Sequence, residues 1–243
     1  ARQALPGLAV GSLEANRGFA AAANIGIEMA LEQGADFTWL VNNDALALPG
    51  LLGMLLDATA VEAIGMATPT VCTMDEPDVV WPSAGWRRSL TLAAFDTTAR
   101  PPSDEPYDVE WATGCCLLVR ANVWRRIGLF DPAYVFYYED HDLCLRARAA
   151  GWRIVHVPRA RVLHRVAGST GPGSALQMYL LARASVPFYW RHSRGPRRAF
   201  MVVYRMGSVA RTLAECALAR RWGVAAAVLA GLRDGLKNDA AVA

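Results

Sequence analysis

Short apolar runs alternate with segments of helical periodicity between residues 8 and 165. The apolar runs predict strands at residues 8–10, 37–41, 63–71, 109–120 with a break at 113–114, 153–157 and 161–164. Apolar side chains at helical spacing predict a helix that ends near residue 34 and further helices at 50–60, 122–127 and 139–151. Strands and helices that alternate in this way favour an α/β layer structure.

Two of these strands carry further expectations. The run at 37–41 is almost wholly apolar, which predicts a strand buried on both faces, as in a parallel sheet. It ends at Asn42-Asn43-Asp44, and ligands of open α/β sheets bind beyond the carboxyl ends of strands. Pro158 is expected to end the strand at 153–157, because proline cannot donate to a strand ladder.

The last third of the chain has a different character. Three helices are predicted there, at residues 174–190, 198–220 and 222–237. Residues 183–221 contain nine arginines against a single acid, Glu215. We therefore expect two regions, an α/β domain over residues 1–173 and a basic, amphipathic helical region over residues 174–243. The loop at 168–173 is rich in glycine and is expected to be mobile.

Composition excludes several classes of protein. The net charge of +3 is too small to argue for nucleic-acid binding. The five cysteines lack the spacing of a zinc site and favour a reducing compartment, and Cys115 and Cys116 are expected to pack within a strand. No uncharged apolar run reaches the roughly 18 residues of a membrane-spanning helix. Because the chain begins with Ala1, a processed or fragmentary chain is expected.

An acidic stretch precedes the helix at 139–151. Glu139, Asp140 and Asp142 occupy its first turn, where unpaired backbone N–H groups and the helix dipole favour ionised carboxylates. An ionised, oriented carboxylate is the requirement for a general base. The alternative is that these acids only cap the helix, because acidic first turns are common.

Three segments together resemble a known family in their residues, order and spacing. They are Asn16-x-Gly18-Phe19-Ala20 with Asn24-x-Gly26, Trp39-Leu40-Val41-Asn42-Asn43-Asp44, and Gly128-Leu129-Phe130-Asp131 followed by Tyr138-Glu139-Asp140-x-Asp142-Leu143-x-x-Arg146. This set resembles the family 2 glycosyltransferases, specifically the rhamnosyltransferase-like branch. The resemblance covers residues 8–170 and continues loosely through Arg183.

The resemblance implies a fold and a reaction. The fold is GT-A, a Rossmann-like mixed sheet flanked by helices, and the reaction transfers a sugar from a nucleoside diphosphate donor with inversion. By position, Asp140 is the base that takes the acceptor proton, and Glu139 is the neighbour that helps to orient it. Displacement of a diphosphate develops negative charge, which a divalent cation neutralises.

The resemblance also implies a site for that cation, Mg²⁺ or Mn²⁺. Asn42-Asn43-Asp44 matches the family's Asp-x-Asp motif, with Asp44 as the carboxylate ligand and Asn42 in the position of the first acid. Asn42 supplies a neutral oxygen where an anion is common. His164 resembles a third metal-contacting position, and imidazole suits Mn²⁺ better than Mg²⁺. A packed or capping histidine is the alternative.

Further residues are implied to bind the substrates. Asn16, Gly18, Asn24 and Asn43 are candidates for the donor nucleotide. The alternative for the first three is that they only form a turn between strand and helix. On the acceptor side the candidates are Tyr138, Asp142, Trp86 and Trp111. The alternative for Trp86 and Trp111, as for Trp81, is packing in the core, because aromatic side chains are usually buried.

The chain departs from the family's pattern at its beginning. Relatives start some tens of residues earlier with a strand, a helix and a second strand, whose loops hold the nucleobase and ribose. We therefore expect an N-terminally incomplete sheet and a donor pocket that lacks one wall.

The favoured function is a metal-dependent, inverting glycosyltransferase of the cytoplasm. The resemblance favours transfer of rhamnose from a dTDP- or UDP-linked donor to a cell-envelope polysaccharide or lipid-linked acceptor. The basic helical region is expected either to touch the inner face of the membrane or to pack on the core or a second copy. Two alternatives remain, a non-catalytic glycosyltransferase-like protein that binds a membrane or a partner, and a nucleotidyltransferase.

Overall fold

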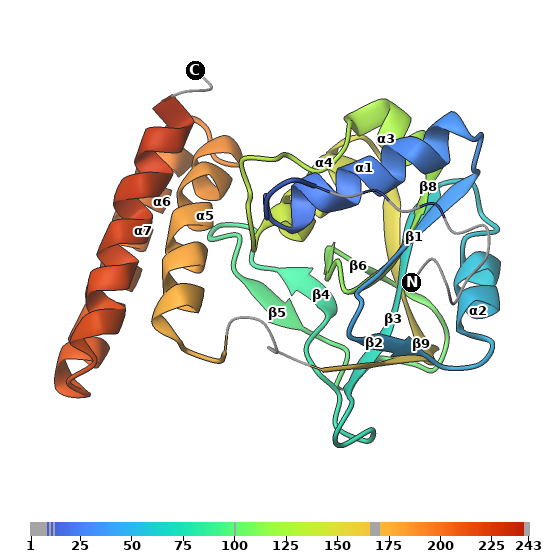
Figure 1. Cartoon of the computed structure of the whole chain (residues 1–243), viewed down its shortest axis with the longest axis horizontal. Helices are drawn as coiled ribbons and strands as arrows, with labels where there is room; N and C mark the ends of the chain where they lie inside the picture. The colour runs from blue at the N-terminus through green and yellow to red at the C-terminus, as the bar shows by residue number, and fades with distance from the viewer. Residues whose placement is uncertain (1–8, 10, 12, 100, 166–170, 241–243) are drawn as a thin grey trace.

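The protein combines a mixed sheet, helices on both of its faces and a group of C-terminal helices to one side (Figure 1). The structure is a computed structural model and describes residues 9, 11, 13–99, 101–165 and 171–240. The strand predicted at 8–10, apart from residue 9, and the first half of the loop predicted at 168–173 therefore lie outside the described residues.

The main sheet holds six strands in the order β1-β8-β3-β9-β2, with β6 on the side of β9. Their bounds are β1 Phe37–Val41, β2 Ala45–Ala47, β3 Ile64–Thr73, β6 Tyr107–Val109, β8 Cys116–Arg120 and β9 Arg153–His164. Only β3 and β9 run parallel, and the other described pairs are antiparallel. A smaller sheet holds β4 (Ala84–Arg87), β5 (Ala94–Asp96) and β7 (Trp111–Ala112).

Two apolar clusters cover the two faces of the main sheet. One face packs against α1 (Phe19–Glu32), α3 (Ala121–Ile127) and α4 (Glu139–Ala149), with Trp124, Phe130 and Leu143 at its centre. The opposite face packs against α2 (Leu51–Ala58) through Leu51 and Leu55. All five cysteines are buried and unbonded, including Cys115 and Cys116, as the apolar surroundings of that pair predicted.

Two details of the sheet correct the sequence analysis. In the described part of the chain β1 lies at one end of the strand order and pairs with β8 alone, antiparallel, so the expectation of a parallel strand buried on both faces was wrong. Pro158 does not end its strand either, because β9 is continuous. Instead, the register of the pairing between β3 and β9 shifts between Pro69 and Thr70. The Thr70 hydroxyl donates to the Pro158 carbonyl.

Three helices follow the sheet, close to the predicted bounds. They are α5 (Ala175–Arg191), α6 (Gly195–Leu218) and α7 (Trp222–Ala240). Helix α5 joins the sheet domain through Phe188, which is buried in a cluster with Leu92 and Tyr134. Within the described chain, no helix is both long enough and apolar enough to cross a membrane.

Helix α7 packs against α5 at two glycines. A Cβ added to Gly231 would lie 2.3 Å from the Tyr179 carbonyl oxygen, and one added to Gly235 would lie 2.5 Å from the Arg183 carbonyl oxygen. The two helix backbones thus approach closely because these positions carry no side chain.

We expect Gly231→Ala to lower the free energy of unfolding by about 1–3 kcal/mol, since the new methyl group meets backbone atoms that cannot move aside. Gly223→Ala is the matched control, because no atom lies within 4 Å of a Cβ at that position of the same helix. Urea unfolding followed by circular dichroism measures both. Equal stability of the two variants would show that the close approach of α7 to α5 does not limit stability.

Candidate functional site

Asn42, Asp44 and His164 come together at one end of the main sheet. Asn42 and Asp44 follow β1, and β2 then pairs with the end of β9 so that Ala45 lies opposite His164. The His164 Nε2 atom lies 3.1 Å from Asp44 Oδ1 and 3.3 Å from Asn42 Nδ2. The structure therefore places the three predicted metal-contacting residues side by side, although 120 positions of sequence separate Asp44 from His164.

This group offers a carboxylate oxygen, an imidazole nitrogen and an amide, a set that fits a divalent cation such as Mn²⁺. The His164 side chain is 10% exposed and the Asp44 side chain 33%, so the group borders solvent. No set of three His, Cys, Asp or Glu side chains suited to a metal occurs among the residues that the structure describes. A cation held by Asp44 and His164 would therefore take further ligands from a substrate.

Asp140 lies at the N-terminus of α4 and is oriented by backbone groups. Its Oδ1 atom accepts a hydrogen bond from the His141 N–H at 2.6 Å, and its Oδ2 atom accepts one from the Gly114 N–H at 3.3 Å. The ring of Phe19 lies 3.3 Å from the position of a Cβ at Gly114. A side chain at Gly114 would therefore crowd the ring that lies beside Asp140.

The turn at residues 113–115 brings Asp140 and Asp44 to the same end of the sheet. Gly114 donates to the Asp140 carboxylate, and the neighbouring Cys115 carbonyl accepts the Asn42 N–H at 2.9 Å. Burial raises the pKa of the Cys115 thiol, and the nearby charges of Cys116 and Asp44 raise it further. The candidate base and the candidate metal-binding group thus border one turn rather than opposite sides of the molecule.

Glu139 differs from the expectation for a first-turn acid. Its side chain is buried, and its Oε2 atom has no hydrogen-bond partner in the described part of the structure. Burial, together with the neighbouring Asp140 charge, raises the pKa of Glu139 well above its usual range. The prediction that the helix terminus keeps Glu139 ionised at neutral pH was therefore wrong. The Asp140 carboxylate is oriented by Gly114 and His141, and the orienting role suggested for Glu139 stays untested.

Arg87 and His141 lie beside the base and were missed by the sequence analysis. Arg87 is 9% exposed, donates to the Leu92 carbonyl at 3.2 Å and contacts His141 Nδ1 through its other terminal nitrogen. Burial lowers the pKa of His141 to about 4, so its imidazole is neutral at pH 7. The Arg87 charge is close enough to Asp140 to interact with it. A lone arginine in a hairpin carries no sequence signal for this placement.

The four acceptor-side candidates have different surroundings. Trp111 is buried, its Nε1 donates to the Phe95 carbonyl and its ring lies 5.2 Å from that of His141. The position of Trp111 therefore agrees with packing in the core, the alternative to acceptor binding. Trp86 is 39% exposed and pairs across the small sheet with Phe95. Of the two tryptophans, Trp86 alone offers an open face.

Tyr138 and Asp142 connect α4 to the C-terminal helices. The Tyr138 ring lies 4.7 Å from that of Phe188, and its backbone takes a left-handed conformation with φ 68°. Asp142 is buried between Arg146, at 2.7 Å, and His192, at 2.8 Å. Burial by itself would raise the pKa of Asp142, but the hydrogen bond from His192 and the charge of Arg146 outweigh it and lower the pKa. Both carboxylate oxygens of Asp142 thus have partners within the protein, and these surroundings favour a structural role over acceptor binding.

The donor-side candidates lie around the start of α1. Asn16 Oδ1 accepts the Gly18 N–H at 3.0 Å, and a Cβ at Gly18 would fall 2.0 Å from the Val135 carbonyl oxygen. Asn24 lies inside α1 rather than in a turn, and its amide pairs with the Phe130 backbone N–H and carbonyl. The expectation of a turn at Asn24 was therefore wrong, since its amide joins α1 to the loop before α4. Asn43 is exposed in the turn before Asp44.

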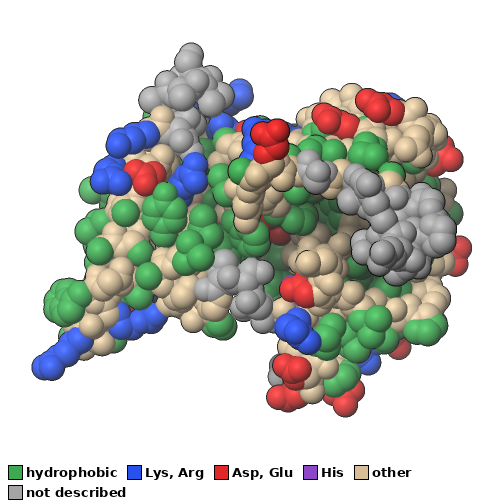
Figure 2. All heavy atoms as spheres, in the orientation of Figure 1, with side chains coloured by type: hydrophobic (Ala, Val, Ile, Leu, Met, Phe, Trp, Pro, Cys, Tyr) green, Lys and Arg blue, Asp and Glu red, His purple; other side chains and the backbone are tan. Residues whose placement is uncertain are grey.

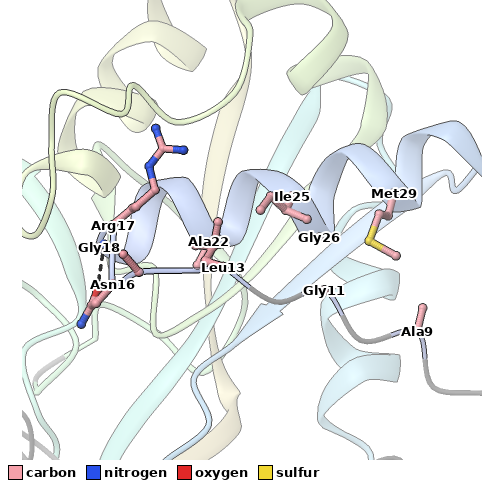
Figure 3. Close-up of a pocket in the computed structure, with 11 residues that line it drawn as sticks. Ala9, Gly11, Leu13, Asn16, Arg17, Gly18, Ala22, Ile25, Gly26 and Met29 are labelled. Atoms are coloured by element: carbon pink, nitrogen blue, oxygen red, sulfur yellow. Dashed lines mark hydrogen bonds between the residues drawn. The ribbon is translucent and has the colours of Figure 1, made fainter.

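A cavity of about 420 Å³ runs along α1. Asn16, Arg17 and Gly18 line one end of it, and apolar residues of α1 and of the preceding chain line the remainder. Figure 3 shows Met29 pointing from α1 toward the chain at Gly11 and Ala9, while the Asn16–Gly18 hydrogen bond closes the turn at the other end. Two of the four predicted donor-side residues, Asn16 and Gly18, thus border a cavity of the size of a small-molecule site.

Comparison with protein families gives one clear match. The model of the family described as "Glycosyltransferase like family 2" matches residues 2–183. The chain is 35% identical over 183 residues to the N-acetylglucosaminyl-diphospho-decaprenol L-rhamnosyltransferase of Mycobacterium tuberculosis (strain ATCC 25618 / H37Rv), over 65% of this chain and 58% of the relative. It is 43% identical over 56 residues to the rhamnosyltransferase WbbL of Escherichia coli (strain K12), over 23% of this chain and 21% of that protein. The chain thus spans under two thirds of the length of these relatives.

Solved structures agree with the observed architecture. The mannosyltransferase PcManGT from Pyrobaculum calidifontis, in complex with GDP-Man and Mn²⁺, superposes with a TM-score of 0.51 at 15% identity, over 92% of this chain and 68% of that one. GalNAc-T7 with UDP, GalNAc and Mn²⁺ also gives a TM-score of 0.51, at 16% identity, over 70% of this chain and 35% of that one. At this level of identity the likeness concerns the fold, and it confirms the mixed α/β architecture that the resemblance implied.

The buried Glu139 predicts a pH dependence of stability. A carboxyl whose pKa rises on folding, here to about 8, binds its proton more tightly in the folded state than in the unfolded state. The free energy of unfolding should therefore fall, by up to roughly 4 kcal/mol, as pH rises from the unfolded pKa near 4.5 to about 8. Urea unfolding across this pH range measures the slope, and Glu139→Gln should flatten it. An identical slope in the variant would show that Glu139 titrates normally.

The buried Asp142 predicts a structural phenotype. Asp142→Asn removes the negative charge between Arg146 and His192 and should lower the free energy of unfolding by about 1–3 kcal/mol. Asp57→Asn, the same change at an exposed position of α2, is the matched control and should have little effect. Thermal and urea unfolding of both variants measure the difference, and an unchanged Asp142→Asn protein would contradict the structural role.

Proposed function

The chain belongs to the glycosyltransferase-like family 2, and on that basis we propose that it transfers an L-rhamnosyl residue from a nucleoside diphosphate donor to a lipid-linked acceptor sugar. Its sheet has the GT-A architecture of that family. The names of its relatives support rhamnose as the sugar and a diphospho-polyprenol as the carrier of the acceptor.

One observation supports the reaction most directly. The turn at 113–115 contacts both Asp140 and the segment that carries Asp44, which pairs with His164. A transferase needs its base on the acceptor and its cation on the donor diphosphate, with one reacting carbon between them. Asp140 is half-buried and held by two N–H groups, so its carboxylate is oriented before the acceptor arrives. In this proposal Asp140 removes the proton of the acceptor hydroxyl, and the attack inverts the anomeric carbon.

Asp44 and His164 would hold the divalent cation, with Asn42 beside them. When bound, such a cation neutralises charge on the departing diphosphate. These two side chains would determine the position of the cation, because the pairing of β2 with β9 holds Asp44 next to His164. The Arg87 guanidinium adds a positive charge near Asp140.

The donor is proposed to approach from the start of α1, where Asn16 and Gly18 border the cavity, and from the exposed Asn43 next to the cation ligands. A dTDP- or UDP-linked sugar is the favoured donor. Trp86, with its exposed ring, is the remaining acceptor-side candidate that is open to solvent. A polyprenol-linked acceptor would lie in a membrane, and we propose that the reaction takes place at its cytoplasmic face.

The alternatives have less support. A nucleotidyltransferase shares the type of sheet and the metal acids, but the family assignment favours sugar transfer. A non-catalytic relative of these enzymes would keep the fold without turnover, and only an assay separates it from an enzyme.

We expect the folded chain to transfer rhamnose from dTDP-rhamnose to N-acetylglucosaminyl-diphospho-decaprenol, and Asp140→Asn to reduce kcat by on the order of 10²–10⁴-fold with little change in KM. Loss of the base removes a group needed in the transition state only. Transfer of a radiolabelled sugar into the lipid fraction measures the rate, and circular dichroism checks that the variant is folded.

Asp57→Asn serves again as control and should retain full activity. Calorimetry with dTDP and Mn²⁺ provides an independent measurement, in which Asp44→Asn should weaken Mn²⁺-dependent nucleotide binding. Full activity of Asp140→Asn would remove Asp140 from its role. A folded chain that neither binds dTDP nor transfers sugar would favour the non-catalytic alternative.

A further inference from the structure

Helix α6 turns an apolar side to solvent. Val203, Met206 and Leu218 are 70%, 67% and 86% exposed, and they lie on one side of the helix because their spacings match helical turns. The residues that α6 buries, Met201 and Cys216, lie on the other side. The apolar side of this amphipathic helix therefore faces outward, the reverse of a helix that serves only to cover a core.

The turn between α6 and α7 extends this apolar side. Leu218 and Trp222 are exposed on either side of the turn, at 86% and 64%, and Arg220 and Arg221 lie between them. Arg220 takes a left-handed conformation with φ 54°, which reverses the chain. We call these four residues the α6–α7 tip. It combines large apolar side chains with two exposed cations.

Arginine side chains lie at both ends of α6. Arg197 hydrogen-bonds to the Ser89 and Leu90 carbonyls, and Arg221 to that of Gly173. Backbone carbonyls carry no net charge, so neither guanidinium group has an acidic partner among the residues that the structure describes. The single acid of residues 183–221, Glu215, lies 3.5 Å from Arg211. Figure 2 shows the face of the C-terminal helices on which α5 and α7 lie in front of α6, with hydrophobic side chains in its middle, Lys and Arg side chains at its upper and lower ends and an acidic side chain at the upper end.

The start of α6 lies against the small sheet near the proposed active site. Arg197 contacts the turn between β4 and β5, where Leu90 is 54% exposed. The same hairpin presents Trp86 and Phe95 to solvent as a cross-strand pair. It also carries Arg87, which contacts His141 beside Asp140. The basic, apolar surface is thus joined by direct contact to the hairpin that borders the base.

We propose that the outer side of α6, with the α6–α7 tip, docks on the surface of a membrane that contains anionic lipids. Apolar side chains with arginines at both ends match the chemistry of such a surface, where acyl chains lie below negatively charged head groups. A second copy of the chain suits the surface less well, because a twofold contact would bring the same arginine-rich patches together. The inference deepens the proposed function, since a polyprenol-linked acceptor lies in a membrane.

Vesicle co-sedimentation tests this directly, with vesicles of phosphatidylcholine containing about one third phosphatidylglycerol and with no donor or acceptor present. The wild-type chain should sediment with these vesicles, less with pure phosphatidylcholine, and less at high salt because salt screens the arginines. The double substitution Val203→Glu and Met206→Glu should reduce the bound fraction about tenfold. Because the vesicles contain no sugar, failure of sugar transfer and failure of docking remain distinct results.

Val61→Glu with Val79→Glu is the matched control, since both valines are about half exposed on the sheet domain, at 54% and 46%. It adds the same charge and should leave binding unchanged. Val203→Leu with Met206→Leu keeps the apolar side and should bind as the wild type does. Circular dichroism confirms that each variant is folded.

Three results would overturn the proposal. The first is a wild-type chain that stays in the supernatant with anionic vesicles. The second is equal loss of binding in the α6 variant and in the Val61, Val79 control. The third is a dimer in light scattering that the α6 glutamates dissociate, without vesicle binding by the wild type, because this would assign the surface to a second copy.

Discussion

The hydrogen bond from the Gly114 N–H to the Asp140 carboxylate joins the two halves of the proposed active site. The turn that donates it is fixed by the antiparallel pairing of β1 with β8, which sets Val41 opposite Cys116. The same turn accepts the Asn42 N–H through Cys115, so the metal-binding group and the base take their positions from one piece of backbone. A change of register between these strands would separate the two acids, because every residue beyond the strands would move with it.

The first turn of α4 shows how burial divides neighbouring acids into separate roles. Glu139 is buried without a partner for Oε2 in the described structure and favours its protonated form, while Asp142 is buried between Arg146 and His192 and favours its charged form. Asp140 lies between them with solvent access and two backbone donors. Three carboxyl groups within four residues thus have different chemistry, since each one faces a different layer of the structure.

The C-terminal helices are part of the same unit as the site. Phe188 of α5 packs on Tyr138 immediately before Glu139, and His192 pairs with Asp142. Helix α4 is therefore held from one side by the sheet domain and from the other by α5. In the proposed function, these contacts would connect a membrane-docked α6 to α4 and its candidate base.

The sequence by itself determined the local structure and the list of reactive side chains. Apolar periodicity predicted the described helices and the strands β1, β3, β8 and β9, but not the short strands β2, β4 and β5. The family resemblance of the sequence singled out Asp44, Asp140 and His164. Only the tertiary structure decided which of these side chains meet and how they are charged. The burial of Glu139, the ion pairs of Asp142 and the placement of Arg87 depend on segments far apart in the chain. Periodicity records which face of an element is buried, whereas pKa values and contacts depend on what the fold packs against that face.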